Sequence, residues 1–101
     1  MEEISEETFN EIMDKLMLTI TTYEGNFKEL SFLKNEIESI KIKNLSRLNY
    51  LSKINEWTYE VASRSYVIRF IHHRLHDDIN DAKRGAYKNK RYLAYLEFAY
   101  K

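Results

Sequence analysis

Apolar residues along the first part of the chain recur every three or four positions, which is the spacing of one face of an α-helix. They form a first stripe over residues 9–23 and a second over residues 30–40. Ser5 precedes the first stripe as an N-cap, and acidic residues follow in the first turn, where negative charge suits the helix dipole. The pattern predicts helices over residues 6–24 and 27–42.

The chain contains no proline and only two glycines, Gly25 and Gly85. These residue types are the strongest interrupters of regular structure, so the segment between the two glycines can hold very long helix. Its apolar positions keep helical spacing up to Ala82, with an interruption at residues 63–65 that marks either a bend or a place where a partner is contacted. We therefore predict one long helix over residues 45–83.

Two boundaries complete this prediction. A turn or kink is expected near residues 42–46, where the stripe weakens and Asn44 or Ser46 can cap a new helix. Beyond Gly85, which suits a helix C-cap, a short final helix is expected over residues 87–100.

A helix over residues 45–83 would be roughly 55 to 60 Å long at ~1.5 Å per residue, about twice the length of its neighbours. Neighbours of that length leave apolar surface exposed along it, and such patches usually mark subunit or partner interfaces. We predict an all-α protein with a single domain over residues 1–101, folded as an elongated antiparallel bundle of about four helices and assembled as a homodimer.

Composition limits the class of protein. The sequence is 44% hydrophobic and 32% charged, as expected of a folded water-soluble domain. No apolar stretch approaches the ~20 residues that cross a bilayer, and the N-terminus is acidic where a signal peptide would be basic. We expect a cytoplasmic protein that makes no membrane contact. The sequence has no cysteine, which excludes disulfides and thiolate metal sites.

The leading functional hypothesis is a small non-enzymatic interaction protein, such as an adaptor, inhibitor or assembly factor, that works through exposed helix faces. Such proteins bind through a few aromatic and arginine anchors and not through a pocket. The expected partners are a second copy of the chain and another protein. The candidate anchors lie on or beside the interruption in the long stripe: Trp57, Tyr59, Arg64, Tyr66 and Phe70.

Nucleic-acid binding is the first alternative, because charge is unevenly distributed although the formal net charge is zero. Residues 1–50 carry six Lys or Arg and ten Asp or Glu, whereas residues 51–101 carry ten and six. The basic half would neutralise phosphates, and its tyrosines would stack on unpaired bases. Acidic-to-basic docking between the halves or between subunits explains the same asymmetry. The candidate residues are Arg69, His73, Arg84, Lys88 and Arg91.

All three histidines of the chain lie within five residues. His72 and His76 are one helical turn apart, a spacing that can chelate a transition metal. The run reads H-H-x-x-H, so His73 stands where the metalloprotease pattern H-E-x-x-H has its catalytic Glu. A solvated helix face with ion pairs at helical spacing accounts for the same residues. We expect no metal and no other cofactor.

Arg69 and His76 are separated by six residues, and this R-x(6)-H arrangement resembles the active-site motif of HEPN-type ribonucleases. Members of that family are all-helical and act as dimers. The resemblance implies a His that acts on the ribose 2′-hydroxyl or the leaving group, and an Arg that stabilises phosphate charge. Phe70 follows the arginine where that family usually carries a polar residue. A dimeric ribonuclease is thus the enzymatic alternative to the leading hypothesis.

Overall fold

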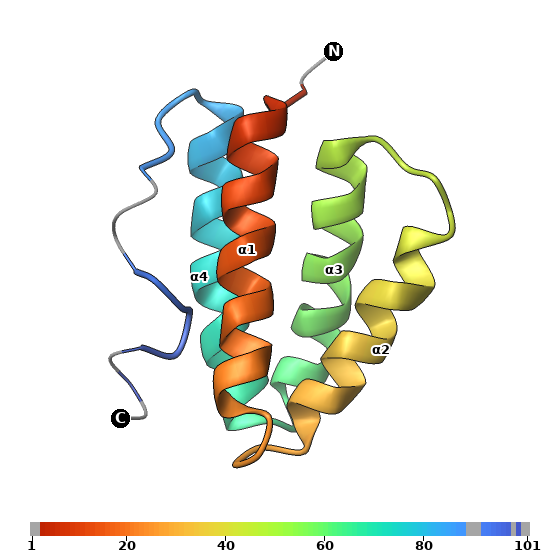
Figure 1. The fold of residues 1–101 in the computed structure, drawn as a ribbon, viewed down its shortest axis with the longest axis vertical. Helices are drawn as coiled ribbons and strands as arrows, with labels where there is room; N and C mark the ends of the chain where they lie inside the picture. Colours follow the sequence, from red (N-terminus) through yellow and green to blue (C-terminus); the bar gives the residue numbers. More distant parts are fainter. Residues whose placement is uncertain (1–2, 89–91, 98, 100–101) are drawn as a thin grey trace.

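The computed structural model describes residues 3–88, 92–97 and 99, and in these residues it contains four α-helices and no strand (Figure 1). The axes of α1, α3 and α4 are nearly aligned in this view, and the axis of α2 is inclined to them. The predicted all-α helical bundle is confirmed. The helices are α1 (Glu6–Tyr23), α2 (Glu29–Lys41), α3 (Arg47–Ala62) and α4 (Tyr66–Lys83).

The first two helices lie within one or two residues of the predicted bounds. Ser5 caps α1, since its Oγ accepts a hydrogen bond from the amide of Thr8 at 3.1 Å. The loop between α2 and α3 is a true turn: Asn44 has a left-handed backbone with φ of 54°. Ser46 then caps α3 by accepting a hydrogen bond from the amide of Asn49 at 3.3 Å.

The long helix predicted over residues 45–83 is wrong, because the chain reverses direction at residues 63–65. Ser65 is extended, and its Oγ accepts a hydrogen bond from the amide of Ile68 at 3.1 Å, which starts α4. The same hydroxyl donates to the Glu29 carboxylate on α2 at 2.9 Å. The interruption in the apolar stripe is therefore a helix–helix turn made without glycine or proline.

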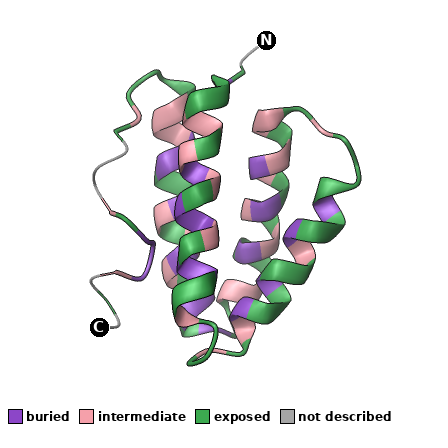
Figure 2. Cartoon of the chain, in the orientation of Figure 1, coloured by how far each residue is buried: buried purple, intermediate pink, exposed green. Residues whose placement is uncertain are grey.

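This reversal buries an apolar stripe that a straight helix would have left exposed. The α3 and α4 helices contact each other more extensively than any other pair, and the buried positions of the bundle face its interior (Figure 2). The core positions of the four helices include Ile12, Leu16, Ile20, Leu30, Leu33, Ile37, Ile40, Leu51, Ile54, Ile68, Ile71, Leu75 and Ile79.

The described residues beyond α4 form no helix, so the final helix predicted over residues 87–100 is wrong there, while residues 89–91, 98 and 100 lie outside the described part. The amide of Tyr95 donates to Thr19 Oγ1 at 2.7 Å, and its carbonyl accepts from Arg74 Nη1 at 2.5 Å. Side chains of α1 and α4 thus occupy both backbone groups that a helix would use. Residues 92–97, called here the C-terminal segment, pack along the bundle instead (Figure 1).

A buried ion pair lies beneath this segment. Lys15 Nζ on α1 is 3.0 Å from Asp78 Oδ2 on α4, and their side chains are 2% and 3% exposed. The Tyr95 hydroxyl donates to the same oxygen at 2.8 Å, which helps to offset the cost of removing the two charges from water. Burial, together with the Asp78 charge, raises the pKa of Tyr95 well above its usual value, so its hydroxyl remains a donor.

The bundle is a compact globule. Its radius of gyration is 12.7 Å, close to the ~13 Å typical of a folded chain of this length, and its extents are 38 × 29 × 22 Å. The elongated shape depended on the long helix and is not observed. Within the described residues, no helix has the length and apolar character that crossing a membrane requires.

Candidate functional site

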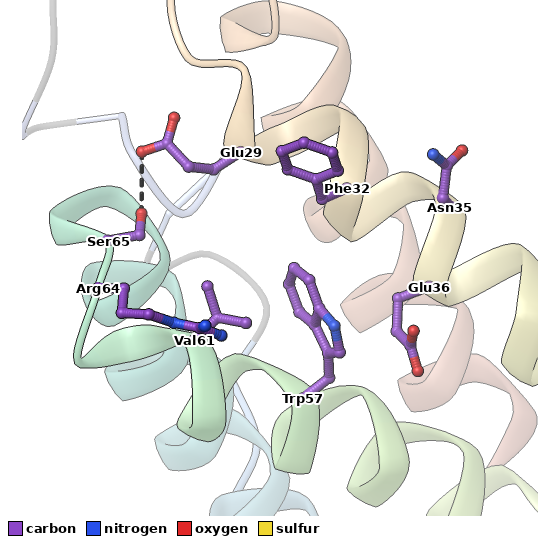
Figure 3. A pocket seen from close by; sticks show the side chains of 8 residues that line it. All are labelled: Glu29, Phe32, Asn35, Glu36, Trp57, Val61, Arg64 and Ser65. Carbon is purple, nitrogen blue, oxygen red and sulfur yellow. Dashed lines mark hydrogen bonds between the residues drawn. The ribbon is translucent and has the colours of Figure 1, made fainter.

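An apolar groove between α2 and α3 is the first candidate for a binding site. It has a volume of about 550 Å³, and Phe32 of α2 and Trp57 of α3 project into it from its two walls (Figure 3). We call it the α2–α3 groove, and its lining residues are Glu29, Phe32, Asn35, Glu36, Trp57, Val61, Arg64 and Ser65.

The floor of the groove is apolar surface that the bundle leaves accessible. Phe32 is 63% exposed, although a large aromatic side chain normally gains by burial. Trp57 and Val61 are half-buried, because one side of each packs against the core and the other faces the groove. An accessible aromatic pair of this kind supplies the area that a binding partner can cover.

Charged groups surround this floor. Glu29 accepts the hydrogen bond from Ser65 and stands in the first turn of α2 beside the start of α4, so two helix dipoles favour its charge. Glu36 and Arg64 lie on opposite sides of Trp57 (Figure 3). Neither of these two side chains has a hydrogen-bond or ion-pair partner in the part of the chain that the structure describes.

A more polar cleft lies between α3 and α4. It consists of two adjoining pockets of about 690 and 490 Å³, and we call it the α3–α4 cleft. Four residues line both pockets: Tyr59, Glu60, His72 and His73. One pocket extends to His76, Asn80 and Lys83, and the other to Arg69.

His72 contacts a buried threonine in the wall of the cleft. The Thr58 hydroxyl donates to the Asn55 carbonyl at 2.8 Å, and His72 Nδ1 lies 3.0 Å from the hydroxyl oxygen. Burial lowers the pKa of His72, and the nearby His76 and His73 lower it further.

His76 is held between two amides. The Asn55 side-chain amide lies 3.2 Å from its Nδ1, and the Asn80 amide lies 3.1 Å from its Nε2. Its ring stacks on His72 with centroids 5.7 Å apart. Among the described residues, no group of three or more His, Cys, Asp or Glu is arranged to hold a metal ion. The metal pair considered from the sequence, His72 and His76, is part of a hydrogen-bonded cleft wall.

The five predicted partner-binding residues do not form one surface. Trp57 and Arg64 line the α2–α3 groove, whereas Tyr59 is 70% exposed in the α3–α4 cleft. Tyr66 is 74% exposed at the start of α4, and Phe70 is half-buried against the core. The anchors were expected on helix faces without a pocket, but two of them line one.

Sequence reasoning missed Phe32 and Glu36, which form the α2 wall of the groove. The available signal was the position of Phe32, which lies between Leu30 and Leu33 and therefore off the apolar stripe of α2. A large aromatic residue outside the core-facing stripe indicates either an exposed anchor or a contact with a distant helix.

The residues proposed for nucleic-acid binding are divided. Arg69 and His73 line the α3–α4 cleft, but Arg84 forms an ion pair with Asp81 at 2.5 Å. Lys88 is exposed beyond α4, and Arg91 lies outside the described residues. The pairing of Arg84 interrupts the positive charge along this face.

Arg69 and His76, the pair that resembles the HEPN ribonuclease motif, line adjoining parts of the α3–α4 cleft. Arg69 Nε donates to the carbonyl of Ala62 at 3.1 Å, and its guanidinium lies 5.8 Å from the centre of the Tyr66 ring. Each of the two side chains thus has structural partners within the chain. Ribonuclease activity stays a prediction.

No protein-family model matches this chain, and comparison with curated proteins and with solved structures finds no match.

Proposed function

We propose that this protein is a small non-enzymatic interaction protein that binds another polypeptide chain in the α2–α3 groove. The observation that carries the proposal is the exposed aromatic floor: Phe32 is 63% exposed and lies opposite the half-buried Trp57 in an open groove of about 550 Å³. Trp and Arg are enriched among residues that dominate binding energy, and both occur here as Trp57 and Arg64.

The shape and chemistry of the groove suit a polypeptide. It lies between two helices, the geometry in which an amphipathic helix or extended segment inserts apolar side chains. Glu36 and Arg64 add one charge of each sign at its sides, which favours a partner that presents both. The homodimer expected from the sequence is one form that this binding can take.

Binding is favoured over catalysis by the lining itself. Ser65 supplies its hydroxyl to the start of α4 and to Glu29, so that group is engaged in the fold. The lining residues include no histidine, lysine or cysteine, and the two carboxylates, Glu29 and Glu36, are seven residues apart on α2, roughly 10 Å along the helix, so they do not act on one bond as a pair.

A capture experiment tests the groove. The immobilised protein is exposed to an extract of its source cells, and captured proteins are quantified for the wild type and for Phe32→Asp. A carboxylate in the groove should reduce capture by about tenfold or more, because the aromatic anchor is lost and a charge is left to be desolvated.

The matched control is Leu18→Asp, which places the same charge at an exposed apolar residue of α1, outside the groove. It should retain capture. Equal capture by wild type and Phe32→Asp would show that the groove is not the binding surface.

A further inference from the structure

The α2–α3 groove carries two opposite charges at its two ends. Trp57 is on α3, and Arg64 lies in the turn that follows α3, beyond its last residue Ala62. Glu36 lies on the far side of Trp57 from Arg64 (Figure 3). The groove therefore has Glu36 at one end and Arg64 at the other, where Glu29 is hydrogen-bonded to Ser65, with the apolar floor between the ends.

A twofold axis that crosses the middle of the groove at right angles to its length places a second copy against the first and exchanges the two ends. Such an operation places the partner's Arg64 beside Glu36, and the partner's Glu36 beside Arg64. It also brings the exposed Phe32 of each copy into the interface. The two unpaired charges and the exposed aromatic ring all gain partners in one step.

We propose that the occupant of the α2–α3 groove is a second copy of this chain, held in a twofold-symmetric dimer by reciprocal Glu36–Arg64 ion pairs around Phe32 and Trp57. This inference rests on the proposed function and names its partner. The charge pattern is what favours a second copy, because the groove itself supplies both members of each ion pair.

Other charges of the chain are compatible with this pairing. Glu29 lies at the Arg64 end of the groove, but its carboxylate already accepts the Ser65 hydrogen bond and stands beside two helix N-termini. The formal net charge of the chain is zero, so two copies approach without long-range repulsion.

Sedimentation velocity over micromolar to millimolar concentrations measures the self-association. Wild type should sediment as a dimer at the upper end of this range. Glu36→Arg and Arg64→Glu should each weaken the dimer by about tenfold or more, because each puts like charges together at both ion pairs. The matched controls Lys34→Glu and Glu38→Arg reverse exposed charges of α2 outside the groove and should leave the dimer unchanged.

Mixing the two groove variants gives the sharpest test. In a twofold dimer with one chain of each kind, the Arg at position 36 meets the Glu at position 64, and the unaltered Arg64 meets the unaltered Glu36. Both ion pairs are then restored, so two variants that each self-associate weakly should form a heterodimer at wild-type affinity. The altered residues are on the surface, and circular dichroism checks that each variant is folded.

A wild type that stays monomeric over the whole range would overturn the second-copy proposal. So would a dimer that survives both single reversals, or one that mixing fails to restore. Binding of foreign proteins is tested separately: if Phe32→Asp captures the same foreign proteins as wild type, those proteins bind outside the groove, whatever the oligomeric state.

Discussion

Two residues that follow helices, Asn44 and Gly85, have a left-handed backbone, and both belong to residue types that tolerate it. Among the described residues, Asn44 and Gly85 adopt positive φ, 54° and 71°. Asn is one of the few residues with a side chain that occupies this region at low cost, and Gly has no Cβ to oppose it. Gly25, which follows α1, does not have a positive φ.

The two glycines should therefore respond differently to alanine. At Gly85 an added Cβ meets no atom within 4 Å, so the cost is that of the left-handed backbone, about 1–2 kcal/mol of unfolding free energy. At Gly25 the space is also open and the backbone is unstrained, so alanine should be neutral or stabilise by up to ~1 kcal/mol. Urea denaturation of the two variants measures both effects, and equal losses would show that left-handed strain does not distinguish them.

The helix pair α3–α4 is the element that decides the fold. Apolar spacing identified the residues of both helices correctly, because periodicity depends on local sequence. The turn between the two helices was missed, because residues 63–65 include neither glycine nor proline. Ser65 caps α4 locally, but the reversal itself depends on tertiary contacts: the hydrogen bond to Glu29 and the burial gained when the two stripes meet.

The candidate site was predictable only in part, for the same reason. Trp57 and Arg64 were recognised as anchors from their residue types and their place in the chain. Their partner in the groove, Phe32, lies 25 positions before Trp57, and only the inclination of α2 against α3 brings it there. The predicted C-terminal helix is wrong for a similar reason: the backbone amide and carbonyl of Tyr95 hydrogen-bond to side chains of α1 and α4 instead of to neighbouring turns of a helix.

The α3–α4 pair should lose stability in acid. The folded-state pKa of His72 is lowered, so the unfolded chain binds more protons, and stability rises with pH. The neutral His72 ring makes its full contribution to the free energy of unfolding above the unfolded-state pKa of about 6.5. This contribution is lost as the pH falls from there through the folded-state pKa of His72. Partial exposure keeps the slope well below the ~1.4 kcal/mol per pH unit of a full proton.

His72→Asn is the informative variant for this effect, because its amide can still hydrogen-bond to Thr58 but does not titrate. Urea unfolding from pH 7.5 to 5 should show a shallower loss of stability than in wild type; His73 and His76 are common to both proteins. Parallel curves for the two proteins would assign the acid sensitivity to another group.

At the scale of the whole molecule, the buried Lys15–Asp78 pair joins parts of the chain that are far apart in sequence. Lys15 is on α1, Asp78 on α4, and Tyr95 of the C-terminal segment completes the site. The ammonium group also lies 5.1 Å and 5.4 Å from the centres of the Tyr87 and Tyr95 rings. This arrangement fixes the position of the C-terminal segment on the bundle.

Asp78→Ala should destabilise the protein by about 3–5 kcal/mol, because it leaves the Lys15 ammonium buried without its counter-charge. Tyr95→Phe removes one hydrogen bond to a charged group and should cost about 1.5–3 kcal/mol. Thermal and urea unfolding measure both values.

The double variant Lys15→Met with Asp78→Leu is the control, since it removes both charges and keeps apolar volume. It should be more stable than Asp78→Ala. If the two proteins are equally unstable, packing and not the uncompensated charge accounts for the loss.

Trp57 has a consequence for how the groove can be followed in solution. It is the single tryptophan of the chain, and it is half-buried at the floor of the α2–α3 groove. Its indole is therefore an intrinsic fluorophore at the proposed interface, free of overlapping emission from any other tryptophan. Whatever fills the groove displaces water from this ring, so occupancy registers as a blue shift of emission without any attached label.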